Sequence, residues 1–227
     1  MEAIRIGIID DDESRAVILR LSLDNYISDL VGVIPFSEYF NAPEISLIPL
    51  DEDIETIVSR IKDDAYHCVL LDYNLQSQSN VQFNGVDLAK RITSSLYEFP
   101  IFILTSYEDL LFQRETFNTY QVFNTQRFFS AQNGKHDLDG MQKRVVNQVI
   151  TYRRRMREWR EELNELLKKN NRTALEDSRL LELDTFIERS LDADNALPKK
   201  TKEDVSGDNF IHLIEKIDAL INRYGDK

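Results

Sequence analysis

Acidic and hydroxyl side chains follow three short apolar runs of the sequence. Asp10 and Asp11 follow the first run, Asp72 ends the second, and Thr105 ends the third. Short apolar runs bounded by polar residues are typical of buried parallel strands. Because parallel strands in an open α/β sheet bring their carboxyl ends to one edge, where ligands bind, we expect these four side chains to meet in one crevice. Carboxylates beside a hydroxyl group are suited to a hard cation and a phosphoryl group.

The elements that must position these side chains alternate between strand and helix patterns. Strands are predicted at 4–10, 30–36, 67–72, 100–105 and, with a weaker pattern, 127–130. Helices are predicted at 14–26, 53–64, 85–96 and 109–120. This alternation predicts an α/β fold with a five-stranded, parallel, doubly wound, flavodoxin-like sheet, which forms a first domain at residues 1–140.

Two parts of this domain carry more detailed expectations. In the first helix we expect Val17, Leu21 and Leu23 to face the sheet. The connections 37–50 and 76–84 are longer than such a fold needs, and both follow strand ends. We therefore expect both to overhang the acidic crevice, either as plain decoration or as a lid or docking segment.

From residue 138 onward the pattern is helical throughout. A long helix is predicted at 139–169, on the order of 45 Å at 1.5 Å per residue, so it should project beyond the sheet. Helices at 174–191 and 209–224 follow, separated by a polar linker at 192–207, and complete an all-α extension at 141–227. The long helix carries an apolar seam at heptad spacing, formed by Val145, Val149, Tyr152, Met156, Trp159, Leu163 and Leu166. Two copies could pair through this seam, or the later helices could fold back over it.

Charge and composition limit the class of protein. The net charge of -12 argues against a surface that binds nucleic acid as a whole, although the segment 143–172 carries about +6. No apolar stretch approaches the roughly 20 residues that span a bilayer, so no membrane partner is expected. The single cysteine, Cys68, lies in a predicted core strand and excludes a disulfide framework. We expect a cytoplasmic protein.

The first 140 residues resemble the receiver domain of two-component response regulators. Four short motifs, each on its expected element, carry the resemblance: Asp10-Asp11, Leu70-Leu71-Asp72, Asn84-Gly85 and Thr105-Ser106. The resemblance implies that Asp72 is the phosphoacceptor and that Thr105 and Ser106 contact the phosphoryl group. It also implies a bound Mg²⁺ or Mn²⁺. The implied ligands are the carboxylates of Asp10, Asp11 and Asp72 and the backbone carbonyl of Asn74.

The likeness is weaker where the family carries a lysine after the fifth strand. No Lys-Pro pair follows 127–130, and Lys135 is the nearest residue that could pair with the phosphoryl group. Tyr107 lies two residues beyond Thr105, and we expect its bulky ring to shield an acyl phosphate from water.

We therefore expect a phosphoacceptor signalling protein, not an enzyme with a separate substrate. It would either pass its phosphorylation state to another protein or absorb phosphoryl groups as a sink. Its partners would be a histidine kinase or phosphotransfer protein, and a downstream protein or a second copy of the chain. One rival is a pseudo-receiver, an interaction module without phosphorylation. A second rival is a nucleic-acid-binding regulator that uses the arginine-rich segment 153–160, although glutamates on the same helix offer these arginines ion-pair partners.

Overall fold

The computed structural model describes residues 2–106, 122–125, 138–204 and 216. The chain forms two compact units, Met1–Arg153 and Arg154–Lys227. Their boundary falls inside the helix α6 (Leu138–Leu167), later in the chain than the domain boundary at residue 140 predicted from the sequence. Within the described ranges, no helix is both long enough and apolar enough to cross a membrane.

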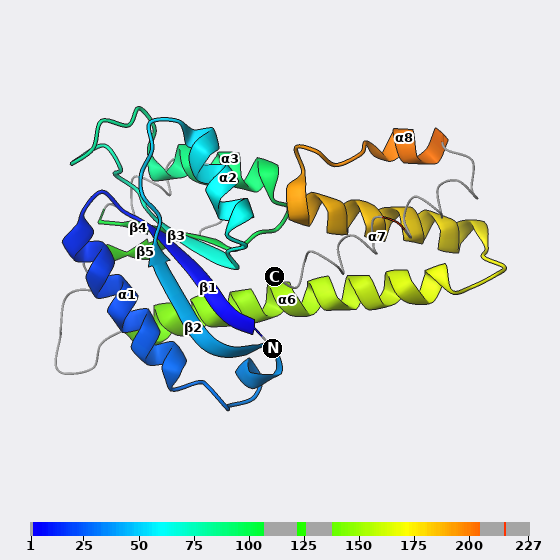
Figure 1. Cartoon of the computed structure of the whole chain (residues 1–227), viewed down its shortest axis with the longest axis horizontal. Coiled ribbons are helices and arrows are strands. Elements are labelled where there is room, and N and C mark those ends of the chain that lie inside the picture. Colours follow the sequence, from blue (N-terminus) through cyan, green and yellow to red (C-terminus); the bar gives the residue numbers. More distant parts are fainter. Residues whose placement is uncertain (1, 107–121, 126–137, 205–215, 217–227) are drawn as a thin grey trace. The chain divides into compact units, whose positions relative to one another are not determined.

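The first unit is built on a five-stranded sheet in the order β2-β1-β3-β4-β5 (Figure 1). Its strands are β1 (Glu2–Ile9), β2 (Phe40–Leu47), β3 (Cys68–Asp72), β4 (Ile101–Thr105) and β5 (Val122–Asn124). Every strand pair is parallel, which confirms the predicted flavodoxin-like fold. In sheets of this order the connections reverse direction between β1 and β3, and ligands bind at the carboxyl ends of the strands there.

Helices cover both faces of this sheet, which is why its strands read as continuous apolar runs (Figure 1). The helix α1 (Glu13–Ser28) and the beginning of α6 cover one face. The helices α2 (Ile54–Asp63) and α3 (Gly85–Ser95) cover the other. The residues that pack on the first face include Leu19, Leu23, Val145 and Val149, and those on the second include Ile57, Ile61, Leu88 and Ile92.

The position of the second strand was predicted wrongly. The segment 30–36 forms turns that lead into a short 3₁₀ helix, η1 (Phe36–Glu38). The strand β2 lies instead at Phe40–Leu47, inside the expected long connection 37–50, so that connection does not exist as a loop over the crevice. This strand contains Pro43, which pairs with Ile4 of β1. β2 is at the edge of the sheet, where a residue without an N–H group is tolerated.

The fifth strand also differs from its prediction. β5 is Val122–Asn124, where Val122 pairs with Ile103 of β4. The segment 127–130, where this strand was expected, lies outside the described residues, as does the predicted helix at 109–120.

The inward face of α1 was predicted only in part. Leu23 is buried as expected and Val17 is half-buried, but Leu21 is 52% exposed. The buried positions of α1 follow three- and four-residue steps, and they are Ala16, Leu19, Leu23 and Ile27. Leu21 falls between these steps, so the helical period places it on the outer face.

The second unit is helical. The bounds of α6 (Leu138–Leu167) and α7 (Ala174–Asp192) confirm the helices predicted at 139–169 and 174–191. The predicted linker at 192–207 was partly wrong, because the helix α8 (Lys199–Asp204) forms within it. Lys202 of α8 is buried between Asp184 and Glu188 of α7, and these ion pairs hold the short helix in place. The predicted helix at 209–224 lies outside the described residues, apart from residue 216, which is helical.

The heptad seam of α6 is covered within the chain. Val145 and Val149 belong to the core of the first unit, and Tyr152 lies with its ring centroid 6.4 Å from that of Phe99. Trp159 packs on Phe186 of α7 with ring centroids 5.2 Å apart. The remaining seam residues, Met156, Leu163 and Leu166, are buried. Of the two predicted arrangements, the one in which a later helix folds back over the seam is therefore present, and α7 is that helix. Pairing between two copies of the chain stays a prediction.

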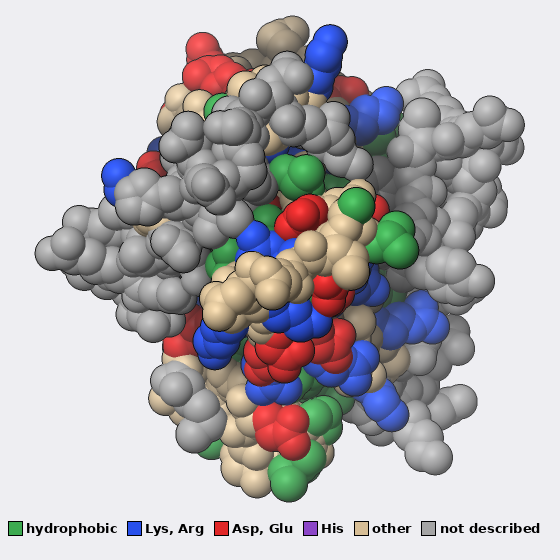
Figure 2. Space-filling model, turned by 90° about the vertical axis from the view of Figure 1, so that its right-hand side faces the viewer, with side chains coloured by type: hydrophobic (Ala, Val, Ile, Leu, Met, Phe, Trp, Pro, Cys, Tyr) green, Lys and Arg blue, Asp and Glu red, His purple; other side chains and the backbone are tan. Residues whose placement is uncertain are grey.

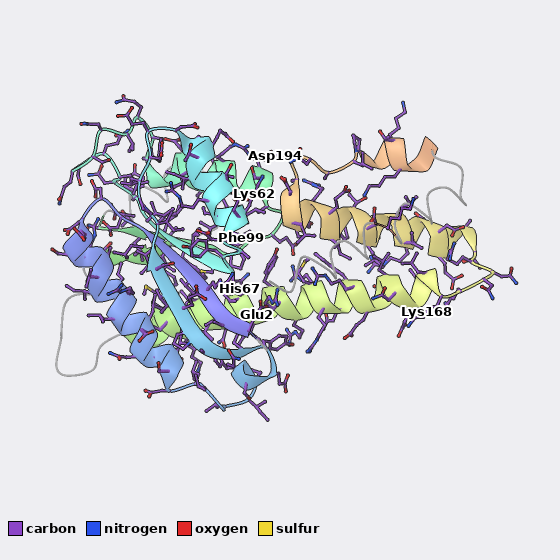
Figure 3. All side chains as sticks on the ribbon, viewed as in Figure 1. Glu2, Lys62, His67, Phe99, Lys168 and Asp194 are labelled. Carbon is purple, nitrogen blue, oxygen red and sulfur yellow. The ribbon has the colours of Figure 1, made fainter. Side chains whose placement is uncertain are left out.

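A charged cluster lies at the amino-end edge of the sheet, where Figure 3 shows Glu2 and His67 together. His67 Nδ1 accepts the Arg5 N–H at 2.9 Å, and its Nε2 lies 3.6 Å from Glu2 Oε1. Burial lowers the pKa of His67. The hydrogen bond from His67, together with the charge of Arg153, lowers the pKa of Glu2 to about 2, although partial burial opposes this shift. The neutral imidazole is therefore the form that fits this cluster.

Candidate metal and phosphoryl site

Three carboxylates meet at the carboxyl ends of β1 and β3. Ile9 pairs with Leu71 in the sheet, so Asp10, one residue beyond β1, lies beside Asp72 at the end of β3. Asp11 turns toward the same point, and one oxygen from each carboxylate lies within 4.8 Å of the others. The predicted convergence of Asp10, Asp11 and Asp72 is therefore present in the structure.

Arg15 lies among these carboxylates. Its Nε donates to Asp10 Oδ2 at 2.7 Å, and its Nη2 donates to Asp10 Oδ1 at 2.6 Å. The same Nη2 lies 2.9 Å from Asp72 Oδ2 and 3.7 Å from Asp11 Oδ1. The hydrogen bond to Asp10 is the largest of the effects that raise the pKa of Arg15 above its usual value. Among the described residues, the guanidinium of Arg15 is therefore the cation that lies within 4 Å of all three carboxylates.

The connection after β3 also reaches the site, as predicted for 76–84. Asp11 Oδ2 accepts a hydrogen bond from the Ser77 hydroxyl at 2.6 Å and another from the Gln78 N–H at 2.5 Å. The second oxygen, Asp11 Oδ1, is buried and accepts no hydrogen bond from the described residues. The loop thus holds Asp11 Oδ2 and leaves Asp11 Oδ1 available to a different partner.

The environment of Asp72 favours its neutral form more than water would. Burial is the main cause of this preference, and the negative charges of Asp10 and Asp11 add to it. The charge of Arg15 opposes it, and so does the Asn74 N–H, which donates to Asp72 Oδ2 at 3.0 Å. The net effect raises the pKa of Asp72 to about 6. The carboxyl group is nevertheless mostly ionised near pH 7.5.

The turn into α3 fixes the end of β3 from the other side. Asn84 caps this helix in a capping box with Asp87, and the Gly85 N–H donates to the Tyr73 carbonyl at 2.9 Å. A Cβ atom on Gly85 would overlap the backbone carbonyl oxygen of Asp72. Glycine is therefore required here by the close approach of the two chain segments.

The other predicted site residues are placed as follows. Thr105 ends β4 and is buried, and Ser106 follows it. The Tyr73 N–H donates to the Leu104 carbonyl, so a hydrogen bond joins the ends of β3 and β4. The Asn74 carbonyl oxygen accepts a weak hydrogen bond of 3.4 Å from the Ser77 N–H, and its role as a metal ligand stays a prediction. Tyr107 and Lys135 lie outside the described residues.

The residues present fit a divalent cation. Mg²⁺ takes oxygen ligands, and carboxylates are the protein groups that hold it most often. Three carboxylates within ligand distance of one point supply these oxygens, and the buried oxygen Asp11 Oδ1 is one for which the described residues provide no donor.

Sequence reasoning missed Arg15, Ser77 and Gln78. Arg15 follows Asp11 by four residues at the start of α1, so the first helical turn directs it back toward the acidic residues, and this spacing was the available signal. Ser77 and Gln78 lie in a loop without periodicity, and no pattern in the sequence identifies which loop residue reaches Asp11.

Comparisons with known proteins found matches among solved structures alone. No protein-family model and no curated protein matches the sequence. Among solved structures, the signal receiver domain of a modulated diguanylate cyclase from Desulfovibrio desulfuricans G20 matches 67% of this chain and 98% of its own, with 16% identity and a TM-score of 0.44. The response regulator RcsB of Salmonella typhimurium matches 96% of this chain and 99% of its own, with 13% identity and a TM-score of 0.39.

A third solved structure, the anti-anti-sigma factor PhyR of Bartonella quintana, matches 70% of this chain and 51% of its own. The identity is 15% and the TM-score 0.40. The structural neighbours thus include receiver domains and response regulators. Because identities and scores of this size say nothing about chemistry, the function must be argued from the geometry of the site.

Proposed function

We propose that this protein is a response-regulator receiver that accepts a phosphoryl group on Asp72 and signals through its helical C-terminal part. The observation that carries this proposal is the cluster of Asp10, Asp11 and Asp72 at the point of the sheet where ligands bind in this fold. Thr105, at the end of the neighbouring strand, adds the hydroxyl group that a phosphoryl site needs.

In this function Asp72 is the nucleophile. A carboxylate oxygen attacks the phosphorus of a phosphohistidine on a kinase or phosphotransfer protein, so the new P–O bond forms as the P–N bond breaks and histidine leaves. Thr105 would donate a hydrogen bond to the transferred group and so couple phosphorylation to the end of β4. No separate substrate is turned over.

The metal would be Mg²⁺ or Mn²⁺, held by the carboxylates of Asp10, Asp11 and Asp72 and the Asn74 carbonyl. When bound, it would neutralise negative charge on the incoming phosphoryl oxygens. The Ser77 hydroxyl and the Gln78 N–H would keep the Asp11 carboxylate oriented during transfer, because both donate to the same oxygen.

The helix α6 offers a direct route for the signal. Val145 and Val149 pack in the core of the first unit, and the same helix continues into the second unit, where Glu162 pairs with Arg179 of α7 at 2.8 Å. A change in how α6 packs on the sheet would therefore reach the helical unit, which would in turn contact a downstream protein or a second copy of the chain.

The test is intact-mass spectrometry of the full chain after incubation with Mg²⁺ and acetyl phosphate. We expect the wild type and the control Asp24→Asn to gain one phosphoryl mass, and Asp72→Asn to gain none. Chelation of Mg²⁺ should abolish the gain. If folded wild-type protein gains no mass, or if Asp72→Asn gains as much as the wild type, the proposed function is wrong.

One observation favours a pseudo-receiver as the second candidate. Arg15 already provides a cation to the three carboxylates, as it would in a pocket that needs no metal. The same experiment separates the two candidates, because a pseudo-receiver would gain no phosphoryl mass under any of these conditions.

The nucleic-acid rival finds less support. Arg153 pairs with Glu2, while Arg154 and Arg157 lie 3.9 Å and 4.0 Å from glutamates one helical turn ahead, as the sequence predicted. Figure 2 shows Lys and Arg side chains beside Asp and Glu side chains over the described part of one face. Such interleaved charge lacks the continuous positive surface that attracts a phosphate backbone.

A further inference from the structure

The guanidinium of Arg15 lies among the carboxylates of Asp10, Asp11 and Asp72, which form the acidic pocket. Its Nη2 contacts Asp10 Oδ1 at 2.6 Å and Asp72 Oδ2 at 2.9 Å, so one nitrogen of the guanidinium joins residues from the ends of two strands. The backbone of Arg15 is fixed as well, because its N–H donates to the side chain of Asp12, which caps α1. Arg15 is therefore held in place both at its backbone and at its guanidinium group.

The pocket needs this positive charge when no metal is present. The carboxylates of Asp10, Asp11 and Asp72 are almost withdrawn from solvent, with side-chain exposures of 1%, 0% and 5%, whereas Arg15 is 23% exposed. Three buried carboxylates repel one another, and removing a charge from water without a partner is strongly unfavourable. Hydrogen bonds from a guanidinium to carboxylates are among the strongest in proteins and offset this repulsion.

We propose that Arg15 is a built-in counter-cation that competes with the divalent metal for this pocket, so that metal binds only when the guanidinium withdraws. This inference rests on the proposed function, in which the same carboxylates hold Mg²⁺. The oxygens that Arg15 contacts, Asp10 Oδ1 and Asp72 Oδ2, belong to two of the three carboxylates that would hold the metal. A guanidinium and a divalent ion at these oxygens would be in contact, and two cations at such a distance repel each other.

The competition has two consequences for this site. The apo pocket is stabilised by Arg15, so its carboxylates can remain close together without metal. Metal affinity is lowered by the free energy needed to break the contacts of Arg15. Because Arg15 belongs to the first turn of α1, its withdrawal on metal binding would also move a positive charge at the start of this helix.

The test compares Mg²⁺ binding by the wild type, Arg15→Gln and the control Arg20→Gln, each as the full chain, using isothermal titration calorimetry. Metal binding must break hydrogen bonds of Arg15 to carboxylates, and one hydrogen bond to a charged group corresponds to about 10- to 100-fold in an equilibrium constant. We expect Arg15→Gln to bind Mg²⁺ roughly 10- to 100-fold more tightly, and Arg20→Gln to match the wild type. Equal or weaker binding by Arg15→Gln overturns the inference.

Thermal unfolding gives a second readout. Without Mg²⁺, Arg15→Gln should unfold at a lower temperature than the wild type, because three carboxylates have lost their counter-cation. Saturating Mg²⁺ should raise its unfolding temperature by more than it raises that of the wild type. Arg15→Lys, which keeps the charge, should bind Mg²⁺ with an affinity between those of the wild type and Arg15→Gln.

A measurement on the wild type keeps the inference testable if Arg15→Gln does not fold. In ¹⁵N NMR spectra, the Arg15 Nε–H group should be protected from hydrogen exchange without metal and should lose this protection as Mg²⁺ is added. If Mg²⁺ binds while the Arg15 Nε–H signal and its protection remain unchanged, the guanidinium has not withdrawn and the inference is wrong.

The phosphorylation assay separates this inference from the proposed function. If the wild type is phosphorylated on Asp72 while Arg15→Gln gains no affinity for Mg²⁺, the competition is refuted and the proposed function stands. If Arg15→Gln gains affinity and neither protein is phosphorylated, the competition stands and the proposed function fails. If neither protein binds Mg²⁺ at millimolar concentration, both are refuted.

Discussion

Gly85 links the fold of the first unit to the position of the phosphoacceptor, and Gly85→Ala should disturb both. The added methyl group would overlap the carbonyl oxygen of Asp72. It would also lie 3.0 Å from the Asp72 carbonyl carbon and 3.1 Å from Tyr73 Cα. Carbon atoms in contact prefer about 3.5–4.0 Å, so the end of β3 and the start of α3 must separate by about 0.5–1 Å.

The size of the effect follows from three contributions. Overpacking of this kind costs about 1–3 kcal/mol. Separation also weakens the hydrogen bond from the Gly85 N–H to the Tyr73 carbonyl, now 2.9 Å, with a loss of up to about 1 kcal/mol. Alanine is more favourable than glycine at a helical position, and this difference stabilises the variant by about 1 kcal/mol. These contributions give a net loss of about 1.5 kcal/mol at the middle of their ranges and of at most about 3 kcal/mol, which lowers the unfolding temperature by roughly 3–12 °C.

The same shift should slow phosphorylation, because Asp72 carries the reacting carboxylate in the proposed function. A displacement near 1 Å at a reacting group lowers rates by up to about 100-fold. The assay measures the unfolding temperature by circular dichroism and the rate of phosphoryl-mass gain with acetyl phosphate.

The matched control is Gly7→Ala. Its new methyl group would overlap the buried Ile48 side chain and lie 3.3 Å from Val69 Cγ1, and its three nearest neighbours are all side-chain atoms. We expect a loss of about 1–3 kcal/mol from overpacking but an unchanged phosphorylation rate. If Gly85→Ala unfolds at the wild-type temperature and is phosphorylated at the wild-type rate, the close approach does not constrain Asp72 and the reasoning is refuted.

Two further predictions concern charges remote from the site. The pKa of His67 is lower in the folded protein than in the unfolded chain. The free energy of unfolding should therefore be highest above about pH 6.5 and should fall as the pH drops below this value. In urea titrations, His67→Asn should lose less of this free energy than the wild type between pH 7.5 and pH 5. Lys202→Met leaves Asp184 and Glu188 without their buried cation and should lower stability by about 3–5 kcal/mol, while the exposed control Lys200→Met should change it by less than about 0.5 kcal/mol. Equal losses in the two lysine variants would contradict this.

Much of the candidate site could be predicted because its residues sit at the ends of regular elements. Asp10, Asp72 and Thr105 each end or follow an apolar run, and parallel strands bring such positions to one edge whatever the details of packing. Arg15 could not be assigned in the same way. Its spacing of four residues from Asp11 was a signal, but only the path of α1 relative to the sheet shows that the side chain also reaches Asp72.

The errors in the strands have a similar cause. The segment 30–36 is as apolar as a strand, whereas Phe40–Leu47 contains a proline and reads as a loop. Whether a proline is tolerated depends on which strand lies at the edge of the sheet, and that is a property of the assembled sheet. In the same way, the polar composition of 192–207 predicts a linker, yet buried ion pairs of Lys202 order α8 there.

The sequence by itself determined the alternating α/β pattern, the long helix and the convergence of three carboxylates, because these follow from local periodicity and from the direction of parallel strands. The tertiary structure alone decided which cation those carboxylates hold, which loop atoms contact Asp11 and what covers the seam of α6. Each of these depends on contacts between residues far apart in the chain, or on the direction of a single side chain. Periodicity carries no information about either.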